Sequence, residues 1–380
     1  MKKTPNLYAS LLDKFKKGCP ETYQTSLKNL LAIMSVIIVK ETVNLNKLKN
    51  QIGVVLGNET TQNDSHYRRL TRFFDESFHL FSLWKYLLKI AVKALILRLD
   101  QRGGHKYLLM DATSWEFGKI KFQFLFLSIV YEGVSIPIFF VNLSKKGHSN
   151  FDERKRFLQM ANMLLPLKGM TLLADREYIG RDWFKFLVDE LSLNFVIRLP
   201  QGDYKTDLGH LYGQFIRDIK KGKTKDIPIK IGDCTFRLIG TKNLNPENID
   251  DDLLILLTNL PHKKHKIIAI YGLRWQIECM FKCLKSNGFN MEDLGFTNLS
   301  KVRLMLCIVI ACYVLCVCEG IKKIKKRIEN KEKPEQKKRV SLFHQGYEIV
   351  NLKVQKIALF LDWLINTIFC STKKNKPIFT

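Results

Sequence analysis

The sequence predicts an α/β protein in which a mixed β-sheet, covered by helices, lies between helical regions at both ends of the chain. Three observations support this fold class. Between residues 106 and 199 the apolar pattern follows the order β-β-β-α-β-α-β, which is typical of a mixed sheet with helical layers. Residues 1–100 and most of 299–370 show helical periodicity instead. A stretch punctuated by Gly and Asp at 201–250 interrupts the pattern and indicates a small β-rich insertion.

Composition and charge narrow the class of partner. The chain has 380 residues and a formal net charge of +26, which points to a polyanion, with nucleic acid before an anionic membrane surface. The basic residues interleave with predicted elements and form no single amphipathic anchor, so we expect no membrane partner. The opening Met-Lys-Lys is followed by no apolar run, which predicts no secretory signal. Nine irregularly spaced cysteines favour a reducing cytoplasm.

The N-terminal hundred residues are predicted to be helical. Residues 27–39 and 46–56 form two apolar-rich helices, and Gly57 ends the second. A further helix begins near Ser65, and residues 77–99 form another. The helix from Ser65 carries three arginines: Arg68, Arg69 and Arg72. A helix, a Gly-containing turn and an Arg-bearing helix are the outline of a helix-turn-helix DNA reader. A small helical bundle with a solvated arginine face is the alternative.

The central sheet is predicted from short apolar segments that are bounded by turn residues. Glu132-Gly133 is a hairpin signal between the second and third strands, and helices at 151–165 and 181–190 separate later strands. Residues 304–318 are uncharged and apolar but shorter than the roughly 20 residues of a membrane span, so we expect a buried core helix. The predicted strands are 106–115, 122–131, 134–143, 169–175, 194–199, 227–231, 234–239 and 251–260.

Three acidic residues have contexts that point to chemistry. Asp111 lies inside the first apolar strand, Asp175 ends the fourth, and Glu278 lies on a helix predicted at 262–287. A carboxylate in an apolar strand is costly to bury unless a cation or hydrogen bonds compensate it, and a single one is often satisfied structurally. Two on neighbouring strands and a third on a packing helix make a plausible site for Mg²⁺ or Mn²⁺, which prefer oxygen ligands.

The helix at 262–287 bears a polar and aromatic stripe. On a continuous helix its members fall within an arc of roughly 100°, beside an apolar arc of similar width. The cations could hold phosphates of a strand that lies over two metal ions, and the aromatic residues offer a stacking plane and a phenolic donor. A solvated face is the alternative reading. The stripe comprises Tyr271, Arg274, Trp275, Glu278, Lys282 and Lys285.

These residues resemble a known family. Tyr271, Arg274, Glu278 and Lys285 fit the signature Tyr-x2-Arg-x3-Glu-x6-Lys of the insertion sequence 4 family of DDE transposases. Asp111, and Asp175 in Ala-Asp-Arg-Glu, look like the first and second acids of that family, and the likeness spans residues 105–290. It implies a ribonuclease H-like catalytic domain with a β-rich insertion. It also implies that the three acids bind two Mg²⁺ or Mn²⁺ ions, and that Tyr271, Arg274, Trp275, Lys282 and Lys285 lie at the element's terminal phosphates.

The resemblance implies a cut-and-paste DNA transposase of the bacterial cytoplasm, associated with the nucleoid. Such an enzyme binds the terminal inverted repeats as a dimer, cleaves them, often through a hairpin, and joins them to target double-stranded DNA. A ribonuclease H-fold nuclease without strand transfer, or an inactive DNA-binding remnant, are the alternatives. Some members stack a flipped base on a Trp of the insertion, but residues 184–274 contain none. Tyr204, Tyr212 or Phe236 would have to serve.

Two further polar segments accompany the acids. Arg176 and Glu177 follow the second Asp, either as an ion pair or in support of the acids. His148 and Asn150 are expected on a loop, as contacts rather than catalysts.

The sequence predicts five regions: a helical DNA-binding region at 1–100, a catalytic domain in two parts at 101–200 and 251–330, the insertion at 201–250, and a C-terminal region at 331–380. We expect the last region to contain helices and the dimer contact. Residues 321–339, which lead into this region, are dense in Lys and Arg. They are predicted to form a solvated, DNA-facing or disordered connector.

Overall fold

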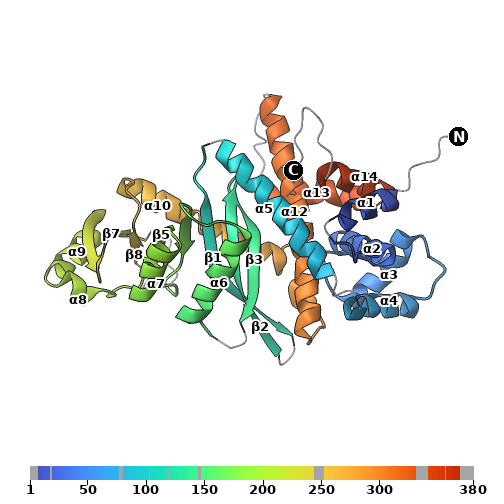
Figure 1. Cartoon of the computed structure of the whole chain (residues 1–380), viewed down its shortest axis with the longest axis horizontal. Coiled ribbons are helices and arrows are strands. Elements are labelled where there is room, and N and C mark those ends of the chain that lie inside the picture. The colour runs from blue at the N-terminus through green and yellow to red at the C-terminus, as the bar shows by residue number, and fades with distance from the viewer. Residues whose placement is uncertain are drawn as a thin grey trace. The chain divides into compact units, whose positions relative to one another are not determined.

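The structure of the protein is a computed structural model, shown in Figure 1. It falls into two compact units, each built from several stretches of the chain. The first unit contains residues 1–102, 114–122 and 279–380, and the second contains 103–113 and 123–278. The five predicted regions remain a prediction. The described residues are 7–17, 19–76, 80–101, 103–117, 120–143, 147–243, 252–330, 341–355 and 357–368.

The N-terminal part of the first unit is helical, as predicted. Gly57 ends α3 with φ 69°, a left-handed conformation that glycine adopts without steric cost. Helices α3 and α4 pack closely at Gly53, where an added Cβ would lie only 2.6 Å from His66 Nε2. The helices are α1 (Leu7–Lys16), α2 (Gln24–Lys40), α3 (Leu45–Leu56), α4 (Asn63–Glu76) and α5 (Leu80–Gln101).

The C-terminal part of the first unit contains α12 (Leu299–Glu329), α13 (Leu342–Val354), α14 (Ile357–Ile368) and a short 3₁₀ helix, Met291–Asp293. Helix α12 is long and apolar enough to cross a membrane, but 89% of its 18-residue apolar window is buried inside the structure, as in a core helix. The predicted connector begins differently: residues 321–329 continue α12, and 331–339 lie outside the described residues.

Helices α12 and α13 meet at two glycines. A Cβ at Gly320 would lie 2.0 Å from the Leu342 carbonyl oxygen, and one at Gly346 would lie 1.7 Å from that of Cys316. Only glycine allows so close a crossing. Beside it, the buried carboxylate of Glu319 accepts from two ammonium groups, Lys322 Nζ at 2.7 Å and Lys353 Nζ at 2.6 Å.

The described residues form an eight-stranded sheet with the order β3-β2-β1-β4-β5-β8-β7-β6. Strands β1, β4 and β5 are parallel, whereas the pairs β2–β3, β5–β8, β8–β7 and β7–β6 are antiparallel. The predicted mixed sheet is therefore confirmed. The strands are β1 (Tyr107–Phe117), β2 (Ile120–Tyr131), β3 (Val134–Leu143), β4 (Thr171–Ala174), β5 (Asn194–Leu199), β6 (Lys225–Ile231), β7 (Cys234–Lys242) and β8 (Leu253–Thr258).

Local signals explain several connections in the second unit. Glu132 and Gly133, with φ 51° and 75°, form the hairpin turn that the sequence predicts between β2 and β3. Helix α6 (Phe151–Leu164) begins with a capping box in which Asn150 and Glu153 bond each other's backbone N–H groups. Helix α7 (Arg181–Lys185) continues as a π-helical turn, residues 186–190.

The insertion differs in part from the expectation. Besides β6 and β7 it contains two helices, α8 (Lys205–Leu208) and α9 (Leu211–Lys220), and its strands extend the main sheet through β8. Phe215 and Ile219 of α9 are buried and pack where β7 has Gly240, whose Cβ would lie 2.1 Å from Ile219 Cδ1. Their spacing of four residues is a helical signal that the surrounding Gly and Asp obscure.

The helix predicted at 262–287 is two helices, α10 (Lys264–Gly272) and α11 (Trp275–Leu284). The break falls at Leu273 and Arg274, where i→i−3 bonds to Ile270 and Tyr271 replace the α-helical pattern. Gly272, a poor helix former, directly precedes it. The arc calculated for one continuous helix therefore does not apply across this turn.

Candidate active site

The sheet register brings two of the predicted acids side by side. In the parallel pair β1–β4, Met110 lies opposite Ala174. Asp111 and Asp175 are the residues that directly follow these two positions in the sequence. The strand residues directly before them are fully buried, whereas the two carboxylates are partly exposed. Their side chains are 19% and 29% exposed. Neighbouring parallel strands thus present two acids at the same edge.

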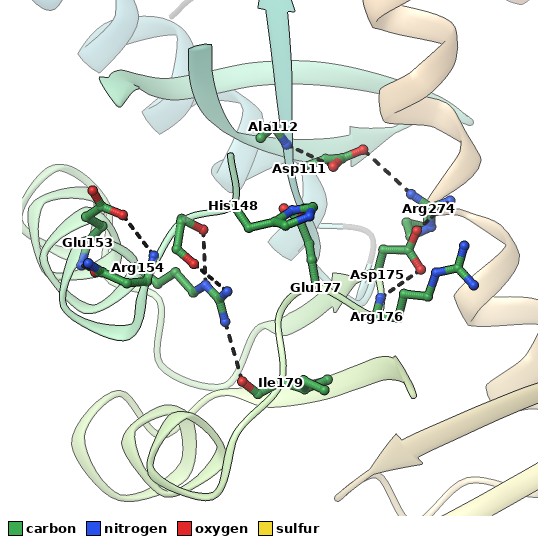
Figure 2. A network of polar contacts seen from close by, with 12 residues as sticks. Asp111, Ala112, His148, Glu153, Arg154, Asp175, Arg176, Glu177, Ile179 and Arg274 are labelled. Atoms are coloured by element: carbon green, nitrogen blue, oxygen red, sulfur yellow. Dashed lines mark hydrogen bonds and ion pairs between the residues drawn. The ribbon is translucent and has the colours of Figure 1, made fainter. Parts of the chain in front are cut away.

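One guanidinium group joins all three predicted acids. Arg274 Nη1 lies 3.6 Å from Asp111 Oδ2, and Nη2 lies 3.8 Å from Asp175 Oδ2 and 2.5 Å from Glu278 Oε1. Figure 2 shows Arg274 facing Asp111 and Asp175. The turn that separates α10 from α11 contains Arg274, and Glu278 follows one helical turn later. We call Asp111, Asp175 and Glu278 the acidic triad.

The acidic triad has more negative charge than its partner neutralises. Burial raises the pKa of Asp111 to about 7, although Arg274 and the Ala112 N–H act in the opposite direction, and the carboxylates of Glu177 and Asp175 raise it further. Lone ionised carboxylates are costly in a partly buried site. The triad is therefore poised to accept additional positive charge.

Tyr271 completes the site from α10. Burial, followed by the Asp175 charge, raises the pKa of its phenol, so the hydroxyl remains a neutral donor at physiological pH. That hydroxyl donates to Asp175 Oδ1 at 3.4 Å, and Arg274 lies over the ring at 5.9 Å. The phenol and the guanidinium therefore hold each other in place beside the second acid.

The donor set fits a hard divalent cation. All three side chains of the triad offer carboxylate oxygens, which suit Mg²⁺ or Mn²⁺. Among the described residues, no group of three or more His, Cys, Asp or Glu is arranged to hold a metal ion as it stands. The guanidinium of Arg274 lies among the carboxylates as a stand-in cation, which shows that the three side chains can share one positive charge.

The remaining predicted residues are more dispersed. Trp275, at the start of α11, is 49% exposed. Lys282 and Lys285 belong to the first unit, where the Lys285 ammonium lies 5.7 Å from the centre of the Trp115 ring. Of the three predicted arginines on α4, Arg68 and Arg72 are exposed and Arg69 is half-buried.

The aromatic residues considered for base stacking differ in access. Phe236 is buried between Phe184 and Phe195, so it cannot receive a base without unpacking the core. Tyr204 and Tyr212 are half-buried, and Lys205 lies 5.7 Å over the Tyr212 ring. Burial raises the pKa of Tyr204 to about 12.

A polar network that the sequence reading left incomplete adjoins the triad. Glu177 pairs with His148 at 2.5 Å. The sequence alone suggests either an ion pair with Arg176 or a supporting role beside the acids. Arg154, only 8% exposed, bonds to Ser149 and to the Ile179 carbonyl oxygen, and was not anticipated as a functional or supporting residue. The Asn150–Glu153 capping box could have located it, since Arg154 follows in the first turn of α6.

Comparisons with known proteins identify a family and a fold. A family described as "Transposase DDE domain" matches residues 102–315. Among solved structures, the chain is similar to a piggyBac transposase, determined by cryo-EM as a synaptic complex with hairpin DNA. The TM-score is 0.53 and the identity 9%, over 95% of this chain and 80% of that chain. This likeness shows the fold, which is ribonuclease H-like as expected. No curated protein matches the chain.

Proposed function

Because the chain belongs to the transposase DDE domain family, whose matched region spans residues 102–315, we propose that it is a cut-and-paste DNA transposase. It binds the terminal inverted repeats of its element, cleaves the DNA there and joins the ends to target DNA. The observation that carries this proposal is the convergence of Asp111, Asp175 and Glu278 on one cationic group.

In this mechanism the acidic triad supplies the ligands for divalent ions, which DDE transposases generally use. A pair of such ions held by these residues would supply the Lewis acidity that activates a water or a 3′-hydroxyl for attack on a phosphodiester and stabilises the leaving oxygen. The β1–β4 register fixes Asp111 and Asp175, while α11 positions Glu278. The protein thereby holds its ligands on rigid elements, which catalytic geometry requires.

Arg274 has two successive partners in this proposal. Without DNA it neutralises part of the triad's charge, and with DNA bound its guanidinium would bind a phosphate near the cleaved bond. Tyr271 donates from its neutral hydroxyl beside Asp175, and the half-exposed Trp275 offers a stacking surface. Lys282 and Lys285 bind neighbouring phosphates, with Lys285 oriented by the Trp115 ring.

End recognition is assigned to α3 and α4. The buried face of α4 comprises His66, Leu70, Phe73 and Phe74, which leaves Arg68 and Arg72 on the opposite side for DNA. We assign a homodimer to the synaptic complex, in which two element ends are paired, and place the dimer contact within residues 331–380. The piggyBac complex contains hairpin DNA, which supports a hairpin intermediate here as well.

The decisive experiment incubates the full chain with a labelled duplex that ends in the element's own inverted repeat. Denaturing gels after addition of Mg²⁺ should reveal nicked, hairpin and joined products, with Ca²⁺ or EDTA as the inactive condition. Asp111→Asn should bind the duplex but cleave none of it. Cleavage without joining would indicate a nuclease, and binding without metal-dependent cleavage a remnant. Either outcome would overturn the proposal. Binding should also weaken steeply with salt.

A further inference from the structure

An imidazole and a carboxylate lie beside the acidic triad without a part in the mechanism above. His148 Nδ1 is 2.5 Å from Glu177 Oε2. The His148 side chain is 77% exposed, whereas that of Glu177 is 21% exposed. Figure 2 shows the pair between Arg154 on one side and the carboxylates of Asp111 and Asp175 on the other. The imidazole therefore projects into solvent from a site next to the first two acids.

Buried interactions fix the two loops that carry this pair. Arg154 Nε donates to Ser149 Oγ at 3.0 Å, and Nη1 donates to the Ile179 carbonyl oxygen at 3.4 Å. Its guanidinium also lies 5.2 Å over the ring of the buried Tyr178. One nearly buried arginine thus ties residues adjacent to His148 to residues adjacent to Glu177. Their relative position is set before any ligand binds, as preorganised recognition requires.

A purely structural role accounts poorly for Glu177. Its carboxylate adds negative charge near Asp111 and is one cause of the raised pKa there. Its Oε1 atom is buried and, within the described part of the chain, accepts no hydrogen bond of good geometry, although the carboxylate interacts with the neighbouring Tyr178 hydroxyl and with the charge of Arg154. Exposed ion pairs contribute roughly 0–1 kcal/mol, which compensates little for this burden. The arrangement gains a rationale if the carboxylate serves to orient the imidazole.

We propose that His148 is a DNA-phosphate contact and that Glu177 is its positioning residue. In the imidazolium form both ring nitrogens donate. Nδ1–H donates to Glu177 Oε2, and Nε2–H, which contacts no hydrogen-bond partner among the described residues, donates to a non-bridging oxygen of a phosphate near the cleaved bond. This inference rests on the proposed function, since it requires DNA over the acidic triad. A metal-ligand role is disfavoured, because hard divalent ions prefer oxygen to imidazole.

The test replaces single phosphates around the cleavage position, one at a time, with neutral methylphosphonates. It measures binding and single-turnover cleavage by the full chain. At one position the wild type should lose about ten-fold in affinity, as expected for one charge-assisted hydrogen bond. His148→Ala should bind unmodified DNA with about ten-fold lower affinity than the wild type. A methylphosphonate at the sensitive position should lower its affinity no further, and methylphosphonates at all other positions should act as they do on the wild type. The control is His265→Ala, which removes an exposed imidazole of α10 and should match the wild type throughout.

Glu177→Gln tests the positioning role. It keeps the side-chain shape and an acceptor oxygen, so we expect a two- to five-fold loss of affinity in EDTA and no further loss in the His148→Ala background. Wild-type-like binding by His148→Ala would overturn the inference, as would an equal loss at every methylphosphonate together with a lower melting temperature. Failure of the wild type to bind or cleave would instead overturn the proposed function.

Discussion

Two carboxylate clusters of this protein, one buried and one partly buried, are built on opposite charge ratios. Glu319, in the first unit, is one carboxylate with two ammonium partners, Lys322 and Lys353. The acidic triad of the second unit is three carboxylates with one guanidinium, Arg274. At Glu319 burial alone would raise the pKa, but the two lysines more than compensate and lower it. At Asp111 burial wins and raises the pKa to about 7.

The difference separates a carboxylate that its neighbours neutralise fully from a triad that its one cationic partner neutralises only in part. An excess of cations satisfies Glu319 in the folded chain, where it links α12 to α13. The triad remains deficient in positive charge, and this deficiency is the feature expected of a metal site. The comparison yields four predictions, given from the largest expected effect to the smallest.

The largest difference should appear in catalysis. Asp175→Asn removes one proposed metal ligand and should slow Mg²⁺-dependent cleavage by about a thousand-fold or more, since metal ligation supplies several kcal/mol of transition-state stabilisation. Glu319→Gln should leave the rate per folded molecule within about two-fold. Active-site titration with labelled element ends measures the concentration of folded, DNA-binding protein to which each rate is normalised. Equal losses in the two variants would erase the distinction between the clusters.

The two acids should also affect stability with opposite pH dependence. Folded Asp111 retains a proton up to about pH 7, whereas an unfolded Asp loses it near 3.9, so stability falls as the pH rises through this window. Asp111→Asn should therefore stabilise the metal-free protein by on the order of 3 kcal/mol at pH 8 and by almost nothing near pH 4. Urea unfolding at the two pH values measures this effect. An Asn variant that is less stable at pH 8 would contradict it.

Glu319 should show the reverse sign. Its folded pKa is lowered, so its contribution is present above the unfolded value and is lost as the pH falls through the folded one. Glu319→Gln should cost about 1–3 kcal/mol at pH 7, because two partly exposed lysines lose a charged acceptor. The cost should shrink toward zero in acid. Thermal melts of both proteins across pH 3–7 would reveal a pH-independent cost if this account is wrong.

The smallest predicted effect concerns competition between Arg274 and metal. Without DNA, Arg274→Gln should strengthen Mn²⁺ binding about ten-fold, because a positive charge within 4 Å of the carboxylates no longer competes. Manganese electron paramagnetic resonance measures free ion directly and does not depend on activity. Lys322→Gln is the matched control and should leave Mn²⁺ binding unchanged. Weaker binding by Arg274→Gln would mean that the arginine supports the metal site instead of occupying it.

Local patterns in the sequence were sufficient for much of the fold. Alternating apolar segments located the strands, the Glu132-Gly133 pair located a hairpin, and Gly57 marked the end of α3. Three features escaped this reasoning, the first being the helices α8 and α9 of the insertion. The break at Leu273–Arg274 depends on a single turn of backbone hydrogen bonding. The pairing of β7 with β8 joins a strand of the insertion to a strand of the main sheet, and the sequence pattern does not indicate this partner.

By itself the sequence determined which residue types recur at which spacing, and hence the order of elements and the identity of three candidate acids. Only the tertiary structure decided that these acids share one guanidinium and that Glu177 turns to His148 rather than to its neighbour Arg176. Strand register and the angle of a helical turn set such contacts. Both follow from the packing of the whole core, since periodicity fixes the face on which a side chain lies but not the distant residue that it meets.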